Sequence, residues 1–130
     1  MPDVDDRLTD AHVAYLATQM LGRLATVDRD GRPQNNPVGF RYNAQLGTID
    51  IDGLDMCRSR KFRNLATNPN VALVVDDIVT VRPWRVRCVE IRGTAEALVD
   101  QPPSRHGASG EVIRIHPTRV ISFGLDVGGE

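Results

Sequence analysis

Cysteine and histidine are scarce in this sequence, and their scarcity excludes several kinds of site. The two cysteines, Cys57 and Cys88, lie in different segments, and only three histidines are scattered along the 130 residues. Because zinc sites need several such ligands at short spacings, no metal site is expected. Reduced thiols in a cytoplasmic protein are the default expectation, and a Cys57–Cys88 disulfide is the alternative.

Long apolar runs and an excess of one charge are also missing. No apolar stretch approaches the ~20 residues that cross a bilayer, and the acidic start, residues 1–6, does not look like a signal region. The 16 basic and 17 acidic residues leave a net charge of −1. We therefore expect neither a membrane nor a nucleic-acid partner, and any anion-binding site must be local.

Short alternating runs separated by tight turns are what the chain does contain. They predict a helix at about 9–20 with Thr9 as its N-cap, and a second short helix after Ser59. Six strands are expected, at about 23–27, 34–42, 48–52, 71–75, 88–97 and 120–124. Residues 111–115 fit strand or helix, and 101–110 read as a surface loop.

This order of elements contains no βαβ rhythm and fits a mainly β fold with some α structure. We expect one domain over residues 1–130, a six-stranded antiparallel barrel with two or more short peripheral helices and loose ends at 1–8 and 125–130. The acidic pairs Asp50/Asp52 and Asp76/Asp77 are interpreted as surface charge. The second pair is expected to end the strand at 71–75.

The second strand has an unusual composition. Asn35 and Asn36 are poor strand formers, Pro37 cannot donate to a ladder, and Gly39 permits close approach to the backbone. Two interpretations stay open at this point. The segment is an irregular edge strand, or its backbone is exposed to a ligand.

The start of the second helix is crowded with cations. Arg58, Arg60 and Lys61 surround the cap Ser59, although a helix N-terminus already carries partial positive charge. Either this is a solvated basic face, or an anion such as phosphate relieves the repulsion. No acid, base or nucleophile stands in a recognisable catalytic motif, so no catalytic residue is assigned and any chemistry would come from a cofactor.

Several short runs occur in a characteristic order: LATVD at 24–28, GRP at 31–33, SRK at 59–61, NL at 64–65, NP at 68–69 and VEIRG at 89–93. Together they resemble the split-barrel flavin and deazaflavin proteins of the pyridoxamine 5′-phosphate oxidase class. The runs GRPQNNPVGF at 31–40, RKFRN at 60–64, VVDD at 74–77 and RIHP at 114–117 are most similar to a deazaflavin-dependent branch. The resemblance implies an FMN-binding-like split barrel and a homodimer with its cofactor groove at the subunit interface.

The resemblance also implies roles for the basic helix. Arg60 and Lys61 match the cofactor-phosphate clamp of the class, with Ser59 beside them. Arg58 and Asn64 belong to the same stretch and are included in the expected site.

On the second strand the sequence departs from the oxidases. Asn36 stands where they place an Arg, and Arg41 replaces a following Lys, which argues against tight FMN binding. The departure is compatible with coenzyme F420, whose ring would lie on the backbone of Asn35, Asn36, Pro37 and Val38. Trp84 and Arg85 are expected to close the groove from the partner subunit.

The expected activity is hydride transfer between coenzyme F420 and a small electron-poor organic substrate. The alternatives are an FMN-binding oxidoreductase on the same fold and a non-catalytic carrier of a flavin-like or haem-like ligand.

Overall fold

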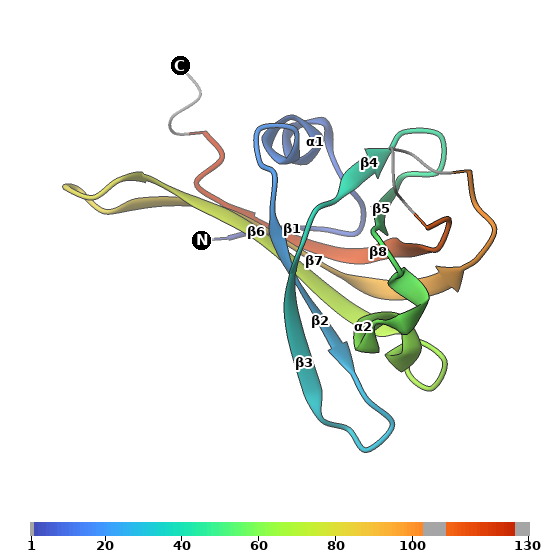
Figure 1. Cartoon of the computed structure of the whole chain (residues 1–130). Helices are drawn as coiled ribbons and strands as arrows, with labels where there is room; N and C mark the ends of the chain where they lie inside the picture. Colours follow the sequence, from blue (N-terminus) through green and yellow to red (C-terminus); the bar gives the residue numbers. More distant parts are fainter. Residues whose placement is uncertain (1, 103–108, 127–130) are drawn as a thin grey trace.

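The structure, a computed structural model, describes residues 2–102 and 109–126. Its strands form one antiparallel sheet (Figure 1). The elements in chain order are β1 (Asp3–Asp5), α1 (Asp10–Leu16), β2 (Gly22–Val27), β3 (Pro33–Val38), β4 (Arg41–Asn43), β5 (Thr48–Asp52), the 3-10 turn η1 (Met56–Arg58), α2 (Arg60–Asn64), β6 (Asn70–Thr80), β7 (Arg85–Leu98) and β8 (Val112–Phe123).

The sheet curls until its two edges meet. Its strand order is β3-β2-β6-β7-β8-β5-β4, so β3 and β4 are opposite edges, and β1 adds to β8. Yet only Gly39 and Phe40 separate β3 from β4 in the chain. Because Val38 and Arg41 can then be at most about 11 Å apart, the edges must converge there. We call residues 38–41 the seam of this open barrel.

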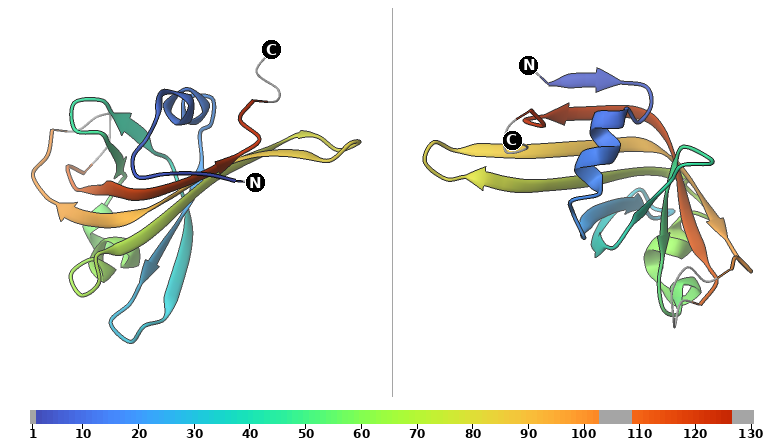
Figure 2. Two further views of the ribbon diagram at one scale, coloured as in Figure 1. Left: turned by 180° about the vertical axis from the view of Figure 1, so that it is seen from behind. Right: turned by 90° about the horizontal axis from the view of Figure 1, so that it is seen from above.

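The core fills the inside of the curl. Alternate residues of the central strands point into it, including Leu24 of β2 and Leu73 of β6, both fully buried. Helix α1 lies across the long strands (Figure 2) and adds Tyr15 and Leu16 to the same cluster. In the part of the chain that the structure describes, no helix is long and apolar enough to cross a membrane.

The split-barrel expectation is confirmed, with eight strands in the described ranges rather than six. Residues 3–5, expected to be loose, form β1 and pair with Val120 to Ser122 of β8. Thr9 caps α1 in a capping box with His12, although the helix ends at Leu16 rather than near residue 20. Both cysteines are free, and burial raises the pKa of Cys88 to about 11.

The prediction that Asp76 and Asp77 end their strand is wrong, because both carboxylates pair with arginines on neighbouring strands. Asp77 lies opposite Arg87 of β7, whose Nε and Nη2 donate to it at 2.9 and 2.6 Å. Asp76 pairs with Arg23 of β2. Such cross-strand pairs let β6 continue to Thr80, so the β6–β7 hairpin projects beyond the barrel (Figure 2).

Strand β8 also runs further than the sequence indicates. It includes residues 112–115, which fit strand or helix, and it continues through Pro117. The register against β7 shifts between Arg92 and Gly93, which places Gly93 opposite Pro117. A Cβ at Gly93 would stand 2.0 Å from the carbonyl oxygen of His116, so the bulge requires glycine there. Part of the loop at 101–110 and most of the tail at 125–130 lie outside the described residues.

Candidate functional site

The two stretches singled out in the sequence meet at the seam. A cavity of about 220 Å³ is lined by Pro37, Val38 and Gly39 on one side and by Ser59 and Lys61 on the other. We call it the seam cavity; its remaining lining residues are Ile51, Asp52, Gly53, Leu54 and Met56. The odd strand and the basic helix, far apart in sequence, therefore form two walls of one site.

Local hydrogen bonds fix the start of α2 against this cavity. Ser59 has extended backbone angles, and its Oγ accepts from the amide of Phe62 at 3.3 Å while donating to the carbonyl of Met56 at 2.7 Å. The hydroxyl is thus used to join η1 to α2. Ser59 positions the half-buried Lys61, which supplies the cationic wall of the cavity.

Asn64 and Asn36 belong to a chain of amide hydrogen bonds. The Nδ2 of buried Asn64 donates to Thr26 Oγ1 at 3.0 Å and to Gln34 Oε1 at 3.3 Å. Gln34 in turn donates to Asn36 Oδ1 at 2.8 Å. This chain ties α2 to β2 and β3, so both asparagines hold the two walls of the site in register. Asn35, next along β3, is exposed.

Arg60 does not share the seam cavity with Lys61. It lines two cavities of about 540 and 480 Å³ beside the β2–β3 turn, where Asp28 and Arg32 also lie. Consecutive residues of a helix point about 100° apart, which explains why the predicted clamp is divided between two places. Arg58 is exposed at the end of η1.

Trp84 and Arg85 lie at the tip of the β6–β7 hairpin, and Trp84 is 65% exposed. Strand β6 starts after α2 and runs 11 residues to that tip, a length of about 35 Å. Figure 1 shows the hairpin projecting away from α2. Trp84 and Arg85 therefore do not join the seam cavity of their own chain.

A second, larger cavity adjoins the first. It measures about 770 Å³ and lies between the α1–β2 connection and strands β4 and β5. We call it the outer cavity; its lining residues are Gln19, Met20, Leu21, Gly39, Phe40, Arg41, Asp50 and Asp52. Gly39 and Asp52 line both cavities, so the two lie next to each other at the seam.

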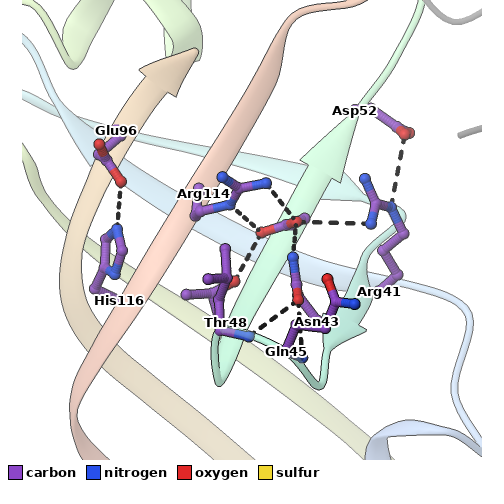
Figure 3. Close-up of polar contacts among 10 residues, drawn as sticks. Arg41, Asn43, Gln45, Thr48, Asp52, Glu96, Arg114 and His116 are labelled. Atoms are coloured by element: carbon purple, nitrogen blue, oxygen red, sulfur yellow. Dashed lines mark hydrogen bonds and ion pairs between the residues drawn. The ribbon is translucent and has the colours of Figure 1, made fainter. Parts of the chain in front are cut away.

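Asp50 stands on the floor of the outer cavity and is 1% exposed, so its interpretation as surface charge is wrong. Arg114 donates to it through Nε and Nη2, both at 3.1 Å, and Thr48 and Asn43 donate at 3.0 Å each (Figure 3). Burial alone would raise the pKa of this carboxyl, but these donors outweigh it and the pKa is lowered. Arg41 adds an ion pair at 3.6 Å.

No local signal in the sequence indicates this network. Arg114 follows Asp50 by 64 positions, and the two meet because β5 pairs with β8. The only hint is positional: Asp50 stands between two isoleucines on a strand, where its neighbours Ile49 and Ile51 are fully buried.

A curled antiparallel sheet whose two edges converge at an open seam defines a split-barrel protein. The match to the family Pyridoxamine 5'-phosphate oxidase extends over residues 8–123. The chain belongs to this family, which places it among the oxidoreductases of the split-barrel fold.

Two kinds of relative support this assignment. The 5a,11a-dehydrotetracycline/5a,11a-dehydrooxytetracycline reductase of Streptomyces rimosus is 48% identical over 119 residues, which is 91% of this chain and 84% of the relative. Among solved structures, an F420 reductase is 26% identical with a TM-score of 0.59, over 76% of this chain and 86% of that one. A conserved hypothetical protein of Mycobacterium tuberculosis shares the fold with a TM-score of 0.71 at 22% identity, over 94% of this chain and 88% of that one.

Proposed function

We propose that this protein is a coenzyme F420-dependent reductase that transfers a hydride to an electron-poor organic acceptor. The observation that carries the proposal is the seam cavity, where Lys61 faces the backbone of Pro37 to Gly39. Support also comes from the family, from a similar protein named as a reductase, and from a structural neighbour named as an F420 reductase.

The residues of the seam cavity fit the phosphorylated part of such a coenzyme. Lys61 supplies a charge-assisted donor for a phosphate oxygen, and the opposite wall is backbone with small or apolar side chains. Gly39 leaves that wall open, because a Cβ there would meet only the carbonyl oxygen of Met20, at 3.9 Å. The site thus offers a cationic end and a flat apolar end.

Coenzyme F420 is preferred over FMN for a reason visible at Asn36. By the family resemblance, the oxidases have an Arg at this position. Here Asn36 instead accepts a hydrogen bond from Gln34 and belongs to the chain of amide hydrogen bonds that holds α2. One cation that would hold an FMN phosphate is therefore replaced by a structural amide.

The size of the seam cavity supports a homodimer. About 220 Å³ is smaller than the 300–1,000 Å³ usual for cofactor-sized ligands, so a phosphate and its linker fit but a tricyclic ring needs further walls. A partner subunit would supply one. The exposed Trp84 and Arg85, on a hairpin that projects from the barrel, are suited to reach a second copy.

If bound, reduced coenzyme F420 would supply a hydride and a proton. An acceptor that took up the hydride at one atom and the proton, exchanged through water, at another would be reduced by two electrons. The chain contributes Lys61 as the anchor, Ser59 and Asn64 as the residues that position it, and the seam as the surface on which two planar molecules are held face to face. Holding the reactants in one orientation provides most of the acceleration.

Equilibrium titration with coenzyme F420, FMN and haem tests the proposal. We expect saturable binding of F420 that is tighter than binding of either other ligand. Lys61→Ala should weaken F420 binding about ten- to a hundredfold, which is the effect of one hydrogen bond to a charged group. Its melting temperature should not fall, because removing one of the crowded cations relieves repulsion at the start of α2.

Arg63→Ala is the matched control, since Arg63 lies on the same helix but lines the cavity beside the β2–β3 turn. Its F420 affinity should stay within about twofold of wild type. Preferential binding of FMN, or an equal loss of affinity in both variants, would refute the proposal. Tight haem binding without turnover would instead identify a carrier.

A further inference from the structure

The outer cavity combines two walls of opposite character. Met20 and Leu21, in the α1–β2 connection, are 87% and 56% exposed, and Phe40 lies beside them. Large apolar side chains gathered at a concave surface mark a binding site more often than a solvated surface. Facing them is Arg41, whose side chain is 43% exposed.

Two carboxylates lie near the guanidinium of Arg41 without forming hydrogen bonds to it. Its Nη1 lies 3.6 Å from Asp50 and its Nε lies 3.9 Å from Asp52 (Figure 3). Both distances exceed those of hydrogen bonds, so the carboxylates steer the group while its N–H donors stay available to a ligand. Arg114 in turn fixes the carboxylate of Asp50 that Arg41 approaches.

Arg41 can offer an anionic ligand the hydrogen bonds that Asp50 and Asp52 are too distant to accept. The buried charge of Asp50 is already compensated by the bidentate contact with Arg114. The remaining counter-charge beside Arg41 is Asp52, whose Oδ2 lies 3.9 Å from the Nε of Arg41. A ligand oxygen with negative charge would gain a charge-assisted hydrogen bond there, whereas a cation would meet the guanidinium.

We propose that the outer cavity is the acceptor-substrate subsite, that it takes a planar apolar molecule bearing an ionised ring oxygen, and that Arg41 determines this specificity. The inference rests on the proposed function, because the seam cavity would place the coenzyme next to Gly39, which lines both cavities. The apolar wall covers the face of the acceptor and Arg41 binds its charged edge.

A pair of matched probes tests the subsite. Lawsone is a naphthoquinone whose ring hydroxyl is ionised at neutral pH, and its methyl ether has the same rings without the charge. Their dissociation constants are measured by calorimetry with protein loaded with oxidised F420. The kcat/KM for their reduction is measured separately with reduced F420. For the wild type we expect lawsone to bind about tenfold more tightly than the ether, the effect of one partly exposed charged contact.

Arg41→Met should abolish this preference and Arg41→Lys should retain part of it. Met20→Glu places a carboxylate at a fully solvated position, where folding is not at risk, and should weaken lawsone binding several-fold more than binding of the ether. Arg92→Gln is the control, because Arg92 is an exposed arginine paired with Glu90 on β7, away from the outer cavity. Its lawsone preference should equal that of the wild type.

The affinity of each variant for F420 separates the two proposals. If wild-type protein fails to bind F420, the proposed function is wrong. If F420 binds but neither naphthoquinone does, or if Arg41→Met keeps the wild-type preference, the acceptor subsite is refuted while the proposed function stands. Loss of the preference in Arg41→Met, with F420 affinity retained, supports the subsite.

Discussion

Replacing Asp50 by Asn tests how much the buried Asp50–Arg114 ion pair contributes to the stability of the barrel. The carboxylate is 1% exposed and accepts two hydrogen bonds from Arg114, one from Thr48 and one from Asn43. An amide at this position retains one acceptor oxygen but directs an NH₂ group at donors. The substitution therefore removes charged hydrogen bonds and leaves the Arg114 guanidinium, 18% exposed, without its counter-ion.

The expected loss of stability is about 3 kcal/mol. Removing one partner of a buried ion pair costs about 3–5 kcal/mol, and the partial exposure of Arg114 places this case at the low end. For a chain of 130 residues this corresponds to a fall in Tm of about 10 °C. Urea denaturation followed by circular dichroism measures the free energy directly.

Two comparisons isolate the cause. Asp76→Asn breaks the exposed pair with Arg23 and should cost about 0–1 kcal/mol. The double variant Asp50→Leu with Arg114→Met removes both charges and should be more stable than Asp50→Asn alone. A loss below about 1 kcal/mol in Asp50→Asn would refute the reasoning, because the network would then contribute no more than a surface pair.

The pH dependence of the Asp50→Asn effect follows from the lowered pKa. Because the pKa of Asp50 is lower in the folded chain than the value of about 3.9 in an unfolded one, its contribution is complete above that value. The contribution is lost as the pH falls through the folded pKa. The difference in stability between wild type and variant should therefore shrink below about pH 4.

Gly39→Val should fold normally, since a Cβ there has room, yet reduce F420 affinity roughly tenfold because the added side chain occupies space at a residue that lines both cavities. Unchanged affinity by fluorescence titration would count against a ligand there. The Tm of the wild type should fall as the pH drops below about 6.5. Burial lowers the pKa of His12, although Asp5 and Asp3 partly oppose this, and the Nδ1 of His12 must be unprotonated to accept a hydrogen bond from the amide of Thr9. In this range His12→Gln should show a flat profile, and a parallel decline in both proteins would contradict this account.

Local chemistry accounts for the parts of the fold that sequence reasoning predicted. Thr9 and Ser59 were expected to cap helices, and both do so by bonds to residues three positions away. The strands at 23–27 and 48–52 follow from alternation and the turns beside them. Of the two interpretations open for the strand that contains Pro37, the edge position is what the structure shows, because β3 ends the sheet.

Long-range contacts account for the errors. Asp76 and Asp77 looked like a strand end because acidic residues disfavour sheets, but arginines on β2 and β7 neutralise them. Asp50 looked exposed because Arg114 could not be assigned to it before the pairing of β5 with β8 was known. In the candidate site, sequence reasoning pairs the basic helix with the second strand as two parts of one site, whereas the outer cavity and the position of Arg41 depend on the curl of the sheet.

The two-residue connection between β3 and β4 has a consequence for how such a protein can change. The pairing of β3 with β2 and of β4 with β5 depends on neighbours other than Gly39 and Phe40. An insertion between these edges would therefore allow the seam to widen without altering any strand register, and a longer connection costs little in loop entropy. If ligands bind at the seam as proposed, the length of this linker, rather than the composition of the core, would limit their size.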